Sequence, residues 1–227
     1  MKTRRGASLA VREIALVGMM AAILTGGKLA LAVLPNVEVV TLLCALYGYV
    51  FGWLGIPAIL VFVSVEPLMW GFNTWVLTYY LYWPFVGIVF MFLSHLGVKK
   101  RFPLTACAVL LVIWFGVLSS LVDVGLFTGF YENFFYRFGI YYARGIVFYL
   151  VEIACNAVVF PLLFLPLSRV LYDIKGRILP EKRRTSAPIA RAASAQRETL
   201  PTLPDTASPD HSSHDGEAQM PAPDEKG

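Results

Sequence analysis

Six apolar runs separated by short breaks occupy most of residues 14–172 in this 227-residue chain. A helix needs about 20 mostly apolar residues to cross the hydrocarbon core of a bilayer, where its backbone polar groups must bond within the helix. Charged residues make up only 15% of the chain, against about a quarter in ordinary soluble domains. The sequence therefore predicts an all-α, polytopic membrane protein, a six-transmembrane-helix bundle. The expected spans are 14–34, 37–51, 56–70, 75–96, 104–127 and 141–172.

The second and third runs are shorter than the other four. Gly52, Gly55 and Pro57 place a compact break between them, and proline is well tolerated in the first turn of a new helix. We expect a tight hairpin that crosses the membrane twice. A re-entrant pair that does not reach the far side is the alternative.

Basic residues gather in three places, and such residues favour the cytoplasmic side. The clusters are Lys2, Arg4, Arg5 and Arg12; Lys99, Lys100 and Arg101; and Arg169, Lys175, Arg177, Lys182, Arg183 and Arg184. They flank the first, fourth and sixth runs, so six crossings place all three on one side. We expect a multi-pass protein of the plasma membrane with both termini in the cytoplasm.

The chain divides into three parts by composition. Residues 1–11 form a short cytoplasmic N-terminus and residues 12–175 the membrane domain. Residues 176–227 are polar and rich in Pro, Ala and Ser, and such a segment cannot bury enough apolar surface to offset its chain entropy. We expect residues 176–227 to be a disordered cytoplasmic tail.

Polar side chains within the membrane domain fall mostly in its outer half. A charge at a helix centre costs about 2.5–3.5 kcal/mol, so these positions indicate a function or a partner. Arg144, Glu152 and Asn156 recur at multiples of four residues on one helical face, where they line a pocket or form an internal salt bridge. The candidate pocket residues are Asn36, Glu38, Asn73, Tyr79, Trp83, Arg144, Glu152 and Asn156.

Tyr79 and Trp83 lie one turn apart, where a flat ring could stack while polar groups fix its edge. An interfacial aromatic belt is the alternative. In the first run, Gly18, Ala22 and Gly26 form a stripe of small residues that allows close approach of another helix, within this chain or outside it.

Catalytic, nucleotide-binding and metal-ligand motifs are not found in the sequence. We therefore expect no enzyme activity, no cofactor, no metal site and no nucleic-acid partner. Any energy source for transport must come from other proteins.

Three parts of the sequence resemble one known family. They are residues 12–16 (Arg-Glu-Ile-Ala-Leu), the small residues Gly18 and Ala22, and residues 34–41 (Leu-Pro-Asn-Val-Glu-Val-Val-Thr). With the six-span length, they resemble the substrate-binding S component of energy-coupling factor (ECF) vitamin transporters over residues 10–175.

This resemblance implies that the bundle captures a vitamin or related micronutrient near its outer face. Asn36 and Glu38 would lie in or near a lid formed by the loop after the first helix. The small-residue stripe would dock against a transmembrane T component, although Gly18 stands where the family has alanine. Two cytoplasmic ATPase subunits would complete the importer and reorient this chain in the bilayer.

Two other functions fit the same residues. A six-span membrane scaffold, such as a cell-shape protein, would use the outer polar residues as internal bridges. A membrane enzyme would use Glu66, Asp123 or Glu152 as an acid or base.

Overall fold

The computed structural model describes residues 2–34 and 39–179, with side chains from residue 10 onward. Of these residues 88% are helical and none is in a strand, which confirms the all-α class. Five helical stretches are long and apolar enough to cross a membrane, as expected of a multi-pass membrane protein. They are Ala10–Leu31, Val40–Trp70, Trp75–His95, Arg101–Phe127 and Phe134–Ile178. The tail predicted to be disordered lies outside the described residues from position 180 onward.

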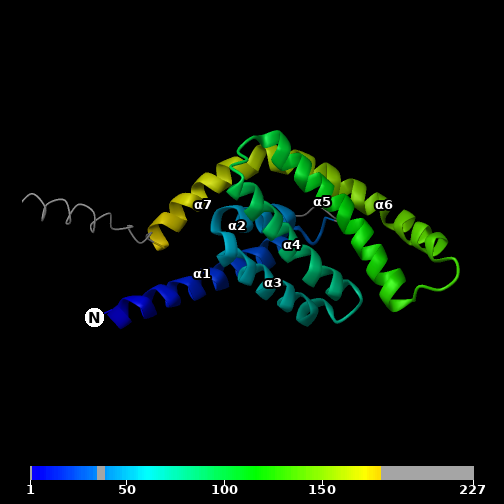
Figure 1. Ribbon diagram of the computed structural model, residues 1–227, viewed down its shortest axis with the longest axis horizontal. Coiled ribbons are helices and arrows are strands. Elements are labelled where there is room, and N and C mark those ends of the chain that lie inside the picture. Colours follow the sequence, from blue (N-terminus) through cyan, green and yellow to red (C-terminus); the bar gives the residue numbers. More distant parts are fainter. Residues whose placement is uncertain (1, 35–38, 180–227) are drawn as a thin grey trace, which may run out of the picture. The chain divides into compact units, whose positions relative to one another are not determined.

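Figure 1 shows the order of the helices. The α-helices are α1 (Lys2–Leu31), α2 (Val40–Phe51), α3 (Gly55–Trp70), α4 (Trp75–His95), α5 (Arg101–Leu121), α6 (Phe134–Val159) and α7 (Leu165–Ile178). The 3-10 turn η1 (Gly52–Leu54) joins α2 to α3, and the π-helical segments η2 (Val122–Phe127) and η3 (Phe160–Phe164) follow α5 and α6. Because α7 ends at Ile178, residues 176–178 are helical, three residues beyond the predicted start of the tail.

The apolar stretch Val40–Trp70 reverses direction at Gly52, whose φ of +61° ends α2. A Cβ on Gly55 would lie 2.5 Å from the carbonyl oxygen of Tyr47, whereas residues eight apart in one straight helix are about 12 Å apart. Helices α2 and α3 are therefore joined by a sharp turn, as expected from the glycines, while the two crossings of the membrane stay a prediction. With 12 and 16 residues they are about 18 and 24 Å long, which is shorter than a hydrocarbon core of about 30 Å.

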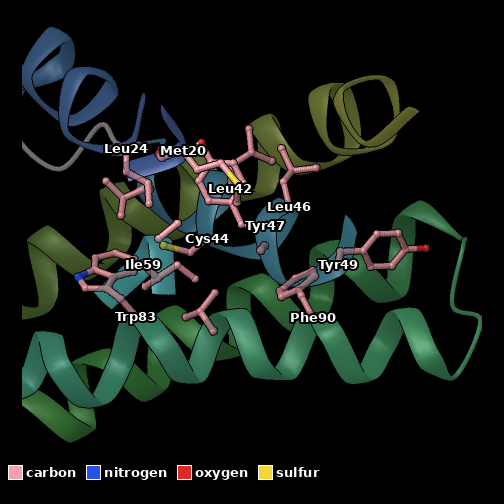
Figure 2. Packing of buried hydrophobic residues seen from close by; sticks show 14 of the residues in the cluster. Met20, Leu24, Leu42, Cys44, Leu46, Tyr47, Tyr49, Ile59, Trp83 and Phe90 are labelled. Carbon is pink, nitrogen blue, oxygen red and sulfur yellow. Dashed lines mark hydrogen bonds between the residues drawn. The ribbon is translucent and has the colours of Figure 1, made fainter. Parts of the chain in front are cut away.

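Helix α2 is the centre of the core, with 11 of its 12 residues buried. A Cβ on Gly48 would overlap the backbone of Gly87, so these two glycines bring the backbones of α2 and α4 into contact. On another side, the Tyr47 hydroxyl donates a hydrogen bond to the carbonyl oxygen of Met20 in α1. Figure 2 shows residues of the surrounding core, among them Leu24, Leu42, Cys44, Leu46, Ile59, Trp83 and Phe90.

Segment η3 joins α6 to α7 and packs on α4. Proline lacks the N–H that an α-helix needs and its ring clashes with the preceding turn, so Pro161 accounts for the π geometry at this point. The rings of Phe160 and Phe164 lie 5.6 and 5.5 Å from the ring of Phe90. These rings connect α4 to η3, which also packs on α5.

Described residues of all three basic clusters lie at one end of the helices. An Nη atom of Arg12 donates a hydrogen bond to the carbonyl oxygen of Ile178, which joins the first cluster to the last. Lys99, after α4, and Arg169, in α7, line the same cavity. This agrees with the prediction from the positive charges that the three clusters share one side.

Candidate functional site

The N-terminal half of α4 carries an aromatic cluster formed by Tyr79, Tyr82 and Trp83 with Phe115 of α5. The Tyr79 and Trp83 rings meet edge to face at 5.6 Å, as expected of residues one turn apart. Phe115 lies 4.8 Å from the Tyr82 ring and 6.4 Å from the Trp83 ring. Tyr82 and Trp83 are buried, while Tyr79 is partly exposed. The cluster therefore presents flat apolar surfaces between α4 and α5.

Two polar groups in this region are buried without hydrogen-bond partners among the described residues. They are the Nε1–H of Trp83, on a residue 3% exposed, and the hydroxyl of Thr78, on a residue 1% exposed. A buried donor left unpaired costs about 1–3 kcal/mol, so native proteins rarely retain one without a reason. Both residues are on α4, next to the aromatic cluster.

Helix α6 buries only two of its 26 residues, and both are polar: Glu152 and Asn156. The side-chain nitrogen of Asn156 donates to the backbone carbonyl of Glu152 at 2.9 Å. The side-chain oxygen of Asn156 is buried and has no partner within the described part of the chain. Here the structure supplies an unpaired acceptor, in addition to the unpaired donors of α4.

The Phe90–Phe160 contact gives the level of these groups along the two helices. Trp83 precedes Phe90 by about two turns, or roughly 10 Å of helix, and Glu152 precedes Phe160 by a similar distance. Both helices run toward the basic end. Trp83, Glu152 and Asn156 therefore all lie on the side of the Phe90–Phe160 contact that faces away from the basic end.

An ion pair between a partly exposed lysine of α1 and a buried glutamate of α3 adjoins the aromatic cluster. Lys28 bonds to Glu66, whose side chain is 1% exposed, and the Lys28 Nζ lies 4.9 Å from the centre of the Tyr79 ring. The pair thus joins α1, α3 and α4. The sequence analysis did not pair these residues, because no local spacing relates positions that are far apart in the chain. Their only signal was that both are charged and both fall in the outer half.

Other predicted site residues are not brought together. Asn73 is exposed, and its side-chain oxygen accepts a hydrogen bond from the backbone N–H of Thr74. Arg144 is exposed, as is Phe148 one turn later, so only the Glu152–Asn156 end of the predicted α6 face is buried. Asn36 and Glu38 lie outside the described residues.

The small-residue stripe of α1 points away from its packed face. Gly18, Ala22 and Gly26 are exposed, and a Cβ on either glycine would meet no atom within 4 Å. The packed face of α1 carries Leu16 and Leu24 instead. The stripe is therefore not used for contacts within residues 2–34 and 39–179.

Among the described side chains, no group of three His, Cys, Asp or Glu residues is arranged to hold a metal ion. Comparisons with protein-family models, with curated proteins and with solved structures find no match for this chain.

Proposed function

We propose that this chain is the substrate-capture component of an ECF-type importer and binds a vitamin-like molecule in the outer half of the bundle. The observation that carries the proposal is the set of buried, unpaired polar atoms on Trp83 and Asn156. Trp83 belongs to the aromatic cluster, Asn156 precedes Phe160 by about one turn, and both lie on the same side of the Phe90–Phe160 contact. A ligand that forms hydrogen bonds with these atoms would offset the cost of burying them away from water.

The chemistry of these groups describes the ligand. Trp83 can only donate a hydrogen bond, the Asn156 oxygen can only accept one, and the Thr78 hydroxyl can do both. The rings of Tyr79 and Phe115 favour a flat aromatic partner. A planar ring bearing amide or carboxylate groups satisfies all of these demands.

The same proposal assigns the exposed stripe of α1 to the T component. Small residues let another helix approach closely, and nothing in the described fold covers Gly18 or Gly26. Six crossings, with the short α2 and α3 traversing the membrane as a hairpin, place both termini in the cytoplasm of a plasma-membrane protein. Two partner ATPases would supply the energy, since no nucleotide-binding motif occurs in this sequence.

Thermal unfolding of the purified full-length chain in detergent, against a broad vitamin panel, tests the proposal. A ligand at 100 times its Kd adds about 2.7 kcal/mol to the free energy of unfolding, which gives a clear shift of the midpoint. Trp83→Phe removes the indole N–H and is expected to reduce that shift. Trp114→Phe, at a 43% exposed position on α5, is the control and should retain it. The proposal fails if no compound in the panel shifts the wild-type midpoint.

The Lys28–Glu66 ion pair favours a second candidate, a membrane scaffold in which outer polar groups bridge helices. Removing one partner of a fully buried pair costs about 3–5 kcal/mol. Because the Lys28 side chain is 27% exposed, Glu66→Gln should cost less than this but still lower stability under either function. The two candidates differ in ligand response. A scaffold predicts that stability falls while no vitamin shifts the midpoint of wild type or variant.

We assign no catalytic role to the acidic residues considered for a membrane enzyme. Glu66 is bound to Lys28, and Asp123 accepts a hydrogen bond of 2.8 Å from the Tyr141 hydroxyl. Glu152 is on a third helix, α6. Turnover of a substrate by the purified chain would contradict this assignment.

A further inference from the structure

A cavity of about 340 Å³ lies at the basic end of the molecule, opposite the proposed vitamin site. Its polar wall residues come from the three elements that meet there: α2, the end of α4 with the loop after it, and α7. They are Tyr49, Ser94, Lys99, Ser168, Arg169 and Tyr172. This volume is sufficient for a small charged group such as a phosphate with its substituents.

The charges around the cavity have a single sign. Lys99 and Arg169 are its only ionisable wall residues besides the tyrosines, and no acidic residue lines it. Among the described residues, neither cation forms an ion pair. Asp173, one turn after Arg169, is exposed and is not part of the wall. Two uncompensated cations facing one hollow favour an anion, and a guanidinium can bind two phosphate oxygens at once.

Hydrogen bonds hold the hydroxyl groups of the wall in place. Tyr49 donates to the carbonyl oxygen of Val98 at 2.8 Å, and Tyr172 donates to that of Tyr49 at 3.2 Å. Ser168 donates to the carbonyl oxygen of Leu165 at 2.9 Å. The Ser94 hydroxyl lies 3.4 Å from that of Tyr172, to which it can donate because the Tyr172 proton is directed at Tyr49. The two cations are therefore the main donors for a ligand.

Segment η3 and helix α7 also expose apolar side chains. Leu162, Leu163 and Val170, which flank the cavity residues of α7 in sequence, are 61%, 44% and 53% exposed. In a membrane these side chains contact acyl chains, while basic residues at a helix end lie at headgroup level. The η3–α7 segment therefore carries both a cation of the cavity wall and exposed, lipid-compatible side chains.

We propose that this cavity binds the phosphate group of an anionic molecule at the membrane interface, through Lys99 and Arg169. The headgroup of an anionic phospholipid and a soluble phosphate share this chemistry, and the experiment separates the two sources. The site is independent of the vitamin pocket, since none of its wall residues belongs to that pocket.

Two arms test the proposal on the full-length chain. In the first, thermal midpoints are measured in nanodiscs of phosphatidylcholine with and without phosphatidylglycerol. In the second, the chain in detergent is titrated with inorganic phosphate at constant ionic strength. The variant K99Q/R169Q removes both cations of the cavity. The control K100Q/R177Q removes the same charge from exposed positions at the same end that do not line the cavity.

Wild type is expected to gain a higher midpoint in at least one arm, K99Q/R169Q to lose most of that gain, and K100Q/R177Q to keep it. A gain with phosphatidylglycerol alone identifies a lipid headgroup, and a gain with phosphate alone identifies a soluble ligand. The proposal is overturned if neither probe raises the wild-type midpoint, or if both variants lose the gain equally. Should the double variant fail to fold, K99Q alone, at an exposed position, carries the same comparison.

Discussion

Helices α2 and α6 differ in how much of their surface is covered by protein and in which side chains are buried. Helix α2 buries 11 of 12 residues, nearly all apolar, against protein on every side. Helix α6 is more than twice as long and buries only the polar Glu152 and Asn156, leaving residues such as Val147 and Leu150 exposed. In water the exposed apolar side chains of α6 would be unfavourable. In a bilayer acyl chains solvate them.

Buried residues therefore differ in kind between the two helices: those of α2 are mostly apolar, and those of α6 are polar. Around α2, burial is close packing, in which glycine and aromatic side chains fit together. On α6, burial protects polar groups from lipid, and one of them, the Asn156 oxygen, still has no partner among the described residues. Stability should therefore depend on α2, and ligand binding on the buried positions of α6.

The largest effect is expected from Gly48→Ala. The added Cβ would overlap the backbone of Gly87, which cannot move aside as a flexible side chain could. Overpacking usually costs 1–3 kcal/mol, and against backbone we expect about 3 kcal/mol or more. The thermal midpoint in detergent measures the loss.

Gly139→Ala in α6 is the matched control, because a Cβ there meets no atom within 4 Å. It should be neutral or stabilise by up to about 1 kcal/mol, as alanine favours helices over glycine. Equal thermal midpoints for Gly48→Ala and Gly139→Ala would contradict the inference that α2 is closely packed and α6 is not.

A pair of leucine truncations gives the next largest effect. Leu46 in α2 is fully buried, so Leu46→Ala should cost about 2–5 kcal/mol by leaving a cavity. Leu150 in α6 is 58% exposed, and Leu150→Ala should change stability by about 0.5 kcal/mol or less. The free energy of unfolding of both variants, from urea or thermal unfolding, measures the difference. A large loss at Leu150 would mean that α6 packs against protein on the face assigned to lipid.

Asn156→Leu tests whether buried Asn156 serves stability or ligand binding. Replacing a buried polar group with incomplete hydrogen bonding by an apolar one of similar size is near neutral, so we expect a change within about 1 kcal/mol. The midpoint shift produced by a vitamin ligand should disappear at the same time. A stability loss as large as that of Leu46→Ala would instead favour the scaffold function.

The smallest effect is expected from Arg144→Gln on α6. Arg144 is exposed and forms no ion pair within the described part of the chain. Its removal should alter the free energy of unfolding by about 0.5 kcal/mol or less. A loss of several kcal/mol, measured by thermal unfolding in a bilayer, would restore the internal salt bridge that the sequence left open.

The positions of the apolar runs predicted most of the helices. The expected runs 56–70 and 75–96 coincide with α3 and α4 within one residue, because hydrophobic length and Gly or Pro breaks are local signals. The contact between Tyr79 and Trp83 also followed from local spacing, since residues four apart share a helical face. The role of these residues in binding stays a prediction.

Pairings between distant helices could not be predicted in the same way. Nothing near Lys28 in the sequence identifies Glu66 as its partner, and nothing near Lys99 identifies Arg169 as a neighbour. The α6 stripe was predicted as a single face, but the protein covers only its Glu152 end and leaves Arg144 exposed. Which part of a helical face is covered depends on the crossing of neighbouring helices.

The sequence alone determined that this protein is helical, rich in membrane-spanning apolar stretches and provided with three basic clusters. Tertiary structure decided that α2 is the buried centre, that Lys28 reaches Glu66, and that Lys99 and Arg169 line one cavity. The physical reason is the distance along the chain over which each effect acts. Apolar runs and turn residues determine the structure of a few neighbouring positions. Burial and ion pairing, in contrast, depend on contacts between helices far apart in the chain.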